Sequence, residues 1–229
     1  MAKFVKGNGL NAAIESIFDE AEGRLTIISP FIKLHQRFID SLKSKIDNPK
    51  LEVKLVFGKN ESNKSKSLSL QDFEFFKQFA NVKIYYEPRL HAKYYANQNT
   101  AVLSSMNLYE YSQNNNIEFG IVTQRDRLKE KLMGVELDND AWQYFNSVVD
   151  GSELVFHNEP IFESNMLGLS KKYIRSEVKV DLLTEELSKP ENAQKIKPKK
   201  PAEVKSIKPK TASEKGYCIR TGEQIPFDL

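Results

Sequence analysis

The sequence predicts an α/β protein in which helices flank both faces of a mixed β-sheet. Three observations lead to this fold class: strand and helix patterns alternate along the chain, several strand patterns are short and apolar, and a polar turn between two of them indicates a hairpin. The expected strands are residues 25–28, 51–57, 82–86, 90–96, 101–104 and 117–123. The expected helices are residues 11–21, 38–46, 70–79 and 138–149.

Each expected helix carries apolar residues spaced three or four apart, which places them on one face. In the first helix, Ile14, Ile17 and Phe18 share that face. The other helices show similar patterns, at Phe38, Ile39, Leu42 and Ile46, at Leu70, Phe73, Phe76 and Phe79, and at Trp142, Tyr144, Phe145 and Val148. We expect these faces to pack against the sheet.

The strands are indicated by short apolar runs and by alternation. Residues 25–28 form an apolar run, whereas residues 51–57 alternate between apolar and polar side chains. The Asn-Gln-Asn segment at residues 97–99 has the composition of a hairpin turn. This turn would place residues 90–96 directly beside residues 101–104.

Length and composition favour one well-packed domain with extensions. The chain has 229 residues, of which 40% are hydrophobic. Cys218 is the only cysteine, so one chain cannot build a disulfide framework or a cysteine-rich metal cluster, and a reducing compartment is expected. No apolar stretch approaches the roughly 18 residues that a membrane span needs. We therefore expect a cytoplasmic protein that needs no cofactor, holds no metal and does not enter a membrane.

Positive charge is concentrated in one segment of the chain. The net charge is +3, yet residues 189–215 contain nine lysines and three glutamates, a local balance of +6 that leaves −3 for the remainder. Because this segment is rich in proline and poor in large apolar residues, we expect a disordered linker. Its lysines are accounted for by solvation, or alternatively by loose attraction to nucleic acid or another polyanion. The predicted organisation is a folded domain at 1–188, this linker at 189–215 and a tail at 216–229.

Four polar residues form two pairs with a spacing of two. His91 and Lys93 make the first pair, and Ser105 and Asn107 make the second. On extended backbone, residues two apart point to the same side, so the hairpin would bring all four side chains to one small anion. Such groups are suited to binding a phosphoryl group. Glu118 is flanked by apolar residues in a later strand pattern and needs a partner, for which the imidazole or the Lys93 ammonium is expected.

These motifs resemble the signature of the phospholipase D superfamily, which runs His-x-Lys, four residues, Asp, six residues, Gly-Ser-x-Asn. The resemblance covers about residues 10–150 and includes residues 28–31, which are similar to the end of the family's first strand beside the active site. Two positions depart from the signature: the aspartate falls at Asn97 or Gln98, and the glycine is Ser104. In the family that aspartate mainly supports the turn, so its replacement bears on turn geometry more than on chemistry. The change at Ser104 can narrow the phosphate pocket.

The resemblance implies a catalytic role for each residue of the motif. His91 would attack phosphorus as a neutral imidazole, and the resulting phosphohistidine would divide one displacement into two easier steps. Lys93 would supply positive charge to the non-bridging oxygens. Ser105 and Asn107 would donate hydrogen bonds as charge builds in the transition state. Glu118 would orient and support the histidine.

The mechanism needs a second imidazole to protonate the leaving oxygen and to activate water, because one imidazole cannot occupy both sides of an in-line displacement. The other histidines, His35 and His157, lack a lysine two residues later and are expected to be structural or on the surface. Single-motif members of the family place two copies of the motif around one phosphate in a twofold homodimer. We therefore expect an obligate homodimer in which His91 is shared, with Ser29 and Arg89 as substrate-binding residues that line the pocket.

Residues 216–229 resemble the first half of a small zinc ribbon that follows bacterial domains of this family. That motif requires Cys-x-x-Cys and a second cysteine pair, whereas Thr221 stands at the second position and Cys218 has no cysteine partner. A single thiolate cannot form a four-ligand structural zinc site. We expect a metal-free tail, with a docking peptide as its most direct use.

The predicted function is a metal-independent phosphodiesterase, most simply a nuclease, that acts through a phosphohistidine intermediate at a site shared across a homodimer. The basic linker is compatible with DNA or RNA. The mild acidity of the remainder and the lack of an obvious basic stripe count against tight duplex binding. Two alternatives stay open: a non-catalytic module that binds nucleic acid or protein, and a phospholipid hydrolase or phosphatidyl transferase.

Overall fold

The structure, a computed structural model, describes residues 2–60, 63–109, 117–124, 137–164, 171–189, 216–217 and 224–225. Residues 1–194 form one compact unit and residues 195–229 form a second. In the second unit, β12 (Gly216–Tyr217) pairs antiparallel with β13 (Gln224–Ile225). Nearly all of the predicted linker, together with Cys218 and Thr221 of the predicted zinc-ribbon-like tail, lies outside the described residues.

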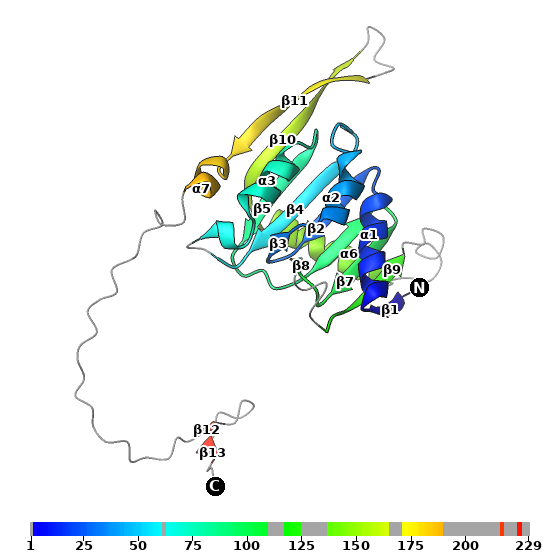
Figure 1. Ribbon diagram of the computed structural model, residues 1–229, viewed down its shortest axis with the longest axis vertical. Coiled ribbons are helices and arrows are strands. Elements are labelled where there is room, and N and C mark those ends of the chain that lie inside the picture. Colours follow the sequence, from blue (N-terminus) through cyan, green and yellow to red (C-terminus); the bar gives the residue numbers. More distant parts are fainter. Residues whose placement is uncertain are drawn as a thin grey trace, which may run out of the picture. The chain divides into compact units, whose positions relative to one another are not determined.

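Within the described part of the first unit, the framework is a nine-stranded mixed sheet (Figure 1). Its strands lie in the order β1-β9-β7-β6-β2-β4-β5-β10-β11. β2, β4 and β5 are parallel to one another, and the other pairings in this sheet are antiparallel. In chain order the strands are β1 (Ala2–Lys6), β2 (Arg24–Ile28), β4 (Glu52–Gly58), β5 (Val82–Glu87), β6 (Tyr94–Asn97), β7 (Thr100–Ser104), β9 (Phe119–Gln124), β10 (Glu153–Ser164) and β11 (Lys171–Asp181).

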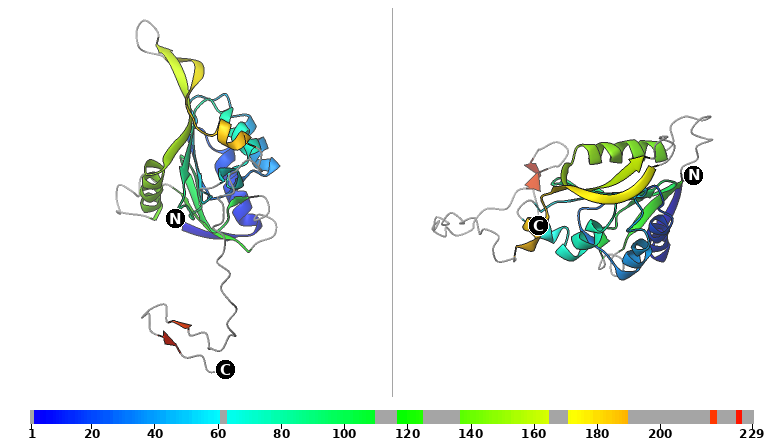
Figure 2. Two further views of the ribbon diagram at one scale, coloured as in Figure 1. Left: turned by 90° about the vertical axis from the view of Figure 1, so that its left-hand side faces the viewer. Right: turned by 90° about the horizontal axis from the view of Figure 1, so that it is seen from above.

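Helices cover both faces of the sheet, as the sequence predicts (Figure 2). α1 (Asn8–Asp19), α2 (Gln36–Lys43) and α3 (Leu70–Lys77) lie on one face, and α6 (Leu137–Asp150) lies on the other. The first face carries the larger core, which is rich in buried aromatic and aliphatic side chains. The second core is smaller and contains Tyr94, whose ring stacks on Phe145 of α6 with centroids 4.2 Å apart. The predicted α/β class is confirmed.

Side-chain caps define where two of the helices begin. Ser69 accepts a hydrogen bond from the backbone N–H of Asp72 at 3.1 Å, which caps α3. The Asp72 carboxylate in turn accepts from the backbone N–H of Leu34 at 3.0 Å and so ties α3 to the segment before α2. His35 caps α2, because its Nδ1 accepts from the backbone N–H of Arg37 at 3.3 Å. His35 therefore has the structural role expected of it.

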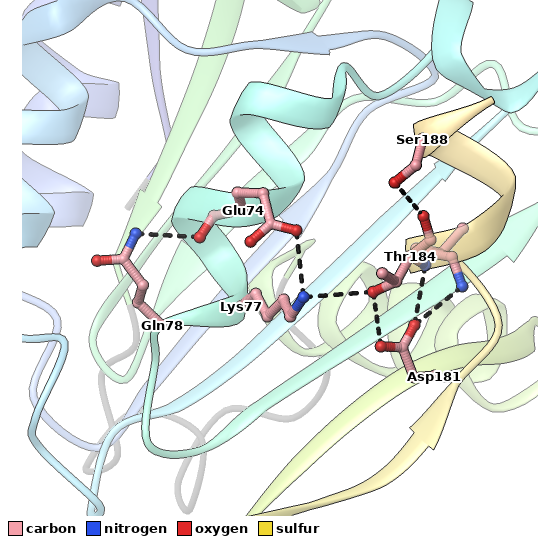
Figure 3. Close-up of polar contacts among 7 residues, drawn as sticks. Glu74, Lys77, Gln78, Asp181, Thr184 and Ser188 are labelled. Atoms are coloured by element: carbon pink, nitrogen blue, oxygen red, sulfur yellow. Dashed lines mark hydrogen bonds and ion pairs between the residues drawn. The ribbon is translucent and has the colours of Figure 1, made fainter. Parts of the chain in front are cut away.

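A short helix, α7 (Thr184–Ser188), packs near α3 (Figure 3). Asp181 accepts hydrogen bonds from the backbone N–H and the hydroxyl of Thr184, at 2.9 and 2.6 Å. Lys77 of α3 bridges the two elements, since its ammonium donates to Glu74 at 3.1 Å and to the Thr184 hydroxyl at 3.3 Å. These contacts join the chain after β11 to the helical layer.

The start of β6 differs from the expectation in a way that matters for the site. The strand begins at Tyr94 instead of residue 90, so His91 and Lys93 precede it. The reason is a turn after β5, in which the backbone N–H of Leu90 donates to the carbonyl of Glu87 at 3.1 Å. The predicted hairpin itself is confirmed, because β6 pairs antiparallel with β7.

Candidate active site

The candidate site lies at one edge of the sheet, where the carboxyl ends of β2, β4 and β5 meet. β6 runs antiparallel to β2 with Tyr94 opposite Ile28, so the segment that leads into β6 reaches the same edge. β7 ends and β9 begins there as well, with Ser104 opposite Gly120. The topology thus brings the three segments that carry the sequence motifs to one edge. Open α/β sheets bind ligands beyond the carboxyl ends of their strands.

His91 lies at this edge in the loop between β5 and β6, and its imidazole is exposed. The Nδ1 atom lies 3.0 Å from Nζ of Lys59. Because an ammonium only donates hydrogen bonds, Nδ1 acts as the acceptor and the ring proton resides on Nε2. The positive charges of Lys93 and then Lys59 hold the pKa of His91 below its ordinary value. The imidazole therefore stays neutral to a lower pH than that of an isolated histidine.

Lys59 is the site residue that motif reasoning misses, since it lies 32 positions before His91. It follows β4 directly and has a φ of 86°, in the left-handed region that a lysine rarely adopts. The preceding Gly58 allows β5 to approach closely: a Cβ there would lie 1.8 Å from the carbonyl oxygen of Glu87. A glycine and a lysine immediately after a buried strand are the sequence signal for this residue.

Lys93 is half-buried between Lys59 and Glu118. Burial, followed by the charge of Lys59, lowers the pKa of the Lys93 ammonium, and the carboxylate of Glu118 acts in the opposite direction. The Lys93 carbonyl accepts a hydrogen bond from the backbone N–H of Ser104 at 3.1 Å. This bond continues the β6–β7 pairing beyond the strand and fixes the position of Lys93.

Ser105 and Glu118 contact each other, whereas the sequence led us to expect the imidazole or the Lys93 ammonium as the partner of Glu118. The Ser105 hydroxyl donates to the Glu118 carboxylate and accepts from the backbone N–H of Phe119 at 3.1 Å. Ser104, which stands where the family has glycine, donates to the carbonyl of Phe119 at 3.0 Å and accepts from the N–H of Met106 at 2.9 Å. The two serines therefore fasten the loop after β7 to the beginning of β9.

Asn107 ends this loop, and one atom of its side-chain amide lacks a partner among the described residues. The Oδ1 atom is buried and has no hydrogen-bond partner within the described part of the chain. Buried polar groups normally have partners, and those without one are frequent at functional sites. A flip of the side-chain amide exchanges Oδ1 and Nδ2, so this position can offer either an acceptor or a donor.

Tyr95 and Ser29, which are both buried, hold the loop that carries Asn107 in place by hydrogen bonds. The fully buried Tyr95 hydroxyl donates to the carbonyl of Met106 at 2.8 Å. The Ser29 hydroxyl donates to the carbonyl of Phe31 at 2.8 Å and accepts from the backbone N–H of Leu108 at 3.1 Å. The sequence led us to expect Ser29 to line the substrate pocket. Ser29 is instead completely buried, and it positions the loop.

Of the remaining candidates from the sequence, Arg89 lies near His91, whereas His157 lies elsewhere. Arg89 belongs to the same β5–β6 loop as His91; its side chain is 87% exposed, and its guanidinium donates to Glu87 at 2.9 Å. His157 belongs to β10 and pairs with Lys83 near the amino end of β5, away from the carboxyl edge. Asn97 supports the hairpin turn, since its Oδ1 accepts from the backbone N–H groups of residues 99 and 100 at 2.8 and 2.9 Å.

The fold and this polar edge define an α/β protein with a candidate anion-binding site. Residues 14–139 match a family model described as a cardiolipin synthase, PLD-like domain. The match spans more than half of the sequence, and the chain belongs to the phospholipase D superfamily.

Three solved structures are similar to this chain, and the first two of them share its fold. NucT from Helicobacter pylori is 14% identical, with 67% of this chain and 98% of that one covered and a TM-score of 0.51. Phosphatidylserine synthase from Haemophilus influenzae Rd KW20 is 15% identical, with 67% and 39% covered and a TM-score of 0.50. The phospholipase D family member Nuc from Salmonella typhimurium is 12% identical, with 67% and 98% covered and a TM-score of 0.48. No curated protein gives a significant sequence match. Among the described residues, no helix has the length and apolar character that crossing a membrane requires.

Proposed function

We propose that the protein is a metal-independent phosphodiesterase that cleaves nucleic acid through a covalent intermediate on His91. The observation that carries the proposal is an exposed imidazole whose pKa is lowered by two lysines, Lys59 and Lys93. The same two ammonium groups attract the negative charge of a phosphodiester. A neutral nucleophile and a cationic binding site are thereby combined.

The chemistry proceeds in two displacements. A ring nitrogen of the neutral His91 forms a bond to phosphorus, the bond from phosphorus to the leaving oxygen breaks, and a second imidazole, which starts as the imidazolium, gives its proton to that oxygen and becomes neutral. Water then attacks phosphorus while the second imidazole takes its proton, and the nitrogen–phosphorus bond breaks. The products are a phosphomonoester and an alcohol, and both imidazoles return to their initial states.

Lys59 controls which nitrogen of the His91 imidazole carries a free lone pair. When its ammonium donates to Nδ1 of His91, the neutral ring carries its proton on Nε2 and has no free lone pair. When the ammonium turns to a phosphate oxygen, Nδ1 is released and the ring can exchange tautomers to present a lone pair to phosphorus. Phosphate binding and activation of the nucleophile are coupled in this way.

The second imidazole has to come from a second copy of the chain. The sequence contains three histidines, of which His35 caps α2 and His157 lies on β10. A twofold axis beside the site would add His91 of the partner subunit without any further sequence requirement. One chain alone supplies half of the proposed machinery.

An apolar patch beside the site supports such a dimer. Phe4 of β1 is 64% exposed and stacks on Phe119, which is 48% exposed, with ring centroids 5.7 Å apart. Ile117 is fully exposed on the other side of Glu118. Exposed apolar patches of this kind mark association surfaces. This patch adjoins Glu118, which accepts a hydrogen bond from Ser105. We assign it to contact with a second copy.

Nucleic acid is favoured as the substrate by the nine lysines of residues 189–215, which would add sequence-independent attraction to phosphates. Phospholipid is the second candidate, because the matching family model carries the description of a cardiolipin synthase. Nucleic acid and phospholipid both contain a phosphodiester. The same protein groups would therefore react with either substrate, and the two substrates differ only in the groups attached to the phosphate.

The test is hydrolysis of single-stranded DNA, duplex DNA, RNA and phosphatidylglycerol vesicles by the full chain in EDTA, beside His91→Ala and the matched His157→Ala. We expect cleavage of at least one nucleic acid that His91→Ala abolishes and His157→Ala retains. Cleavage of vesicles alone would replace nucleic acid by phospholipid as the substrate. Binding of nucleic acid without turnover by the wild type would identify a non-catalytic module.

A further inference from the structure

A hollow of about 480 Å³ opens beside His91, between the β5–β6 loop and α6. One wall consists of Glu87 at the end of β5 and residues of the loop after it, among them Arg89 and His91 itself. The opposite wall is a single stripe of α6 and its end, at Tyr144, Ser147, Val148 and Gly151. The spacing of three and four residues explains why these side chains face the same side of the helix. The volume of the hollow is within the range of small-molecule sites. Of the proposed reacting groups, only His91 lines the hollow.

Tyr144 gives this hollow an aromatic face. The side chain is 61% exposed, although its neighbour Phe145 is buried. Phe145 holds the Tyr144 ring edge-on, with centroids 5.1 Å apart and an interplanar angle of 82°, and itself stacks on Tyr94. An exposed aromatic ring on a rigid helix is a stacking surface for another planar ring.

The facing wall carries hydrogen-bonding groups in a fixed arrangement. The carboxylate of Glu87 accepts from both the backbone N–H and the Nε of Arg89, each at 2.9 Å. This pairing holds the guanidinium at the mouth of the hollow, where the Arg89 side chain is 87% exposed. A planar guanidinium and a carboxylate are suited to the donor and acceptor groups on the edge of a nucleobase.

We propose that this hollow binds the nucleoside that stays attached to the scissile phosphate, with its base stacked on Tyr144 and its edge toward Arg89 and Glu87. The inference rests on the proposed function and adds a substrate class to it: an unpaired nucleotide, as in single-stranded nucleic acid. A phosphodiester bound at His91 must direct its retained substituent away from the lysines, and the hollow begins at that imidazole. The charged mouth and aromatic wall match a base better than an acyl chain.

Two small substrates with the same leaving group test the proposal. Thymidine 5′-(p-nitrophenyl phosphate) retains a nucleoside on phosphorus, whereas methyl p-nitrophenyl phosphate retains only a methyl group. We expect Tyr144→Ala to reduce the ratio of kcat/KM for the first substrate to that for the second by about 5- to 150-fold, the range for loss of one base–aromatic stack. Tyr144→Phe keeps the ring and should hold the ratio within about twofold of wild type. Phe162→Ala, an exposed aromatic on β10, is the matched control and should also leave it unchanged.

Binding provides a readout that does not depend on turnover. Thymidine 5′-monophosphate should bind Tyr144→Ala more weakly than wild type by a similar factor, whereas methyl phosphate should bind both equally. An equal ratio and equal nucleotide binding in Tyr144→Ala and wild type would overturn the subsite. If nucleotide binding depends on Tyr144 but neither substrate is hydrolysed, the subsite stands and the proposed phosphodiesterase is wrong. Vesicle hydrolysis that requires Tyr144, with nucleotide binding that does not, would assign the hollow to a lipid headgroup and also overturn the proposal.

Discussion

The Tyr95 hydroxyl offers a direct test of how the loop after β7 is held. Its ring is fully buried in β6, and its hydroxyl donates to the carbonyl of Met106 at 2.8 Å, between the two predicted site residues Ser105 and Asn107. Burial raises the pKa of Tyr95 well above its ordinary value, so the hydroxyl remains a donor at every pH at which the protein is handled. Tyr95→Phe removes this donor and leaves the ring in place.

The expected cost follows from what the substitution leaves behind. The Met106 carbonyl stays buried without its donor, a loss of about 1–3 kcal/mol in the free energy of unfolding. The ring volume is conserved, so a cavity adds little. For a domain of this size, each 1 kcal/mol lowers Tm by roughly 2–4 °C. Activity should fall further than stability explains, because Asn107 follows the released carbonyl directly.

Urea unfolding gives the free-energy change, and hydrolysis of methyl p-nitrophenyl phosphate at a temperature where both proteins are folded gives the activity. Tyr85→Phe on β5 is the matched control, since its half-buried hydroxyl makes no hydrogen bond found among the described residues. A Tyr95→Phe variant as stable and as active as Tyr85→Phe would refute the account of how this loop is positioned.

Three further predictions concern the same edge of the sheet. Lys59→Met removes one of the positive charges that disfavour the His91 imidazolium. The pKa of His91 should therefore rise, and the acid limb of the pH–rate profile should move to higher pH. An NMR titration in which the His91 pKa is unchanged or falls would contradict this. Gly58→Ala should lower the free energy of unfolding in urea by about 1–3 kcal/mol or more, because the alanine Cβ would lie 1.8 Å from the Glu87 carbonyl oxygen. A variant with the unfolding free energy of the wild type would show that β4 and β5 can separate without cost. Hydrolysis should stay within about twofold on addition of EDTA, since imidazoles and lysines provide the charge; loss of activity with rescue by Mg²⁺ would show that a metal is required.

The sequence predicts much of this edge because its motifs follow the strand pattern. The hairpin is encoded locally by the Asn-Gln-Asn turn, and the turn fixes which residues of β6 and β7 are opposite each other. Glu118 could be assigned to the same site from its strand pattern, but its contact with Ser105 follows from the antiparallel pairing of β7 with β9, which the sequence does not give. The composition of the turn and the alternation of side chains along each strand are sufficient for these inferences.

Other features depend on contacts that no local pattern reveals. β1 has only five residues and pairs with β9, which lies near the middle of the chain, so its pairing is not visible in its own sequence. β10 and β11 carry many charged and exposed residues, which removes the alternation by which a strand is recognised. The Gly58-Lys59 pair marks the end of a buried strand, but the contact of Lys59 with His91 could not be predicted, because it depends on a left-handed backbone position and on the approach of a loop 32 residues later.

Direct observation of the covalent intermediate would test the central claim, that His91 is the nucleophile. Thymidine 5′-(p-nitrophenyl phosphate) is mixed with the protein in EDTA, the reaction is quenched with alkali, and peptides are analysed by mass spectrometry. We predict a burst of p-nitrophenol and a thymidylyl adduct on the peptide that contains His91, with neither in His91→Ala. Steady turnover with no adduct, or an adduct on another residue, would contradict the account.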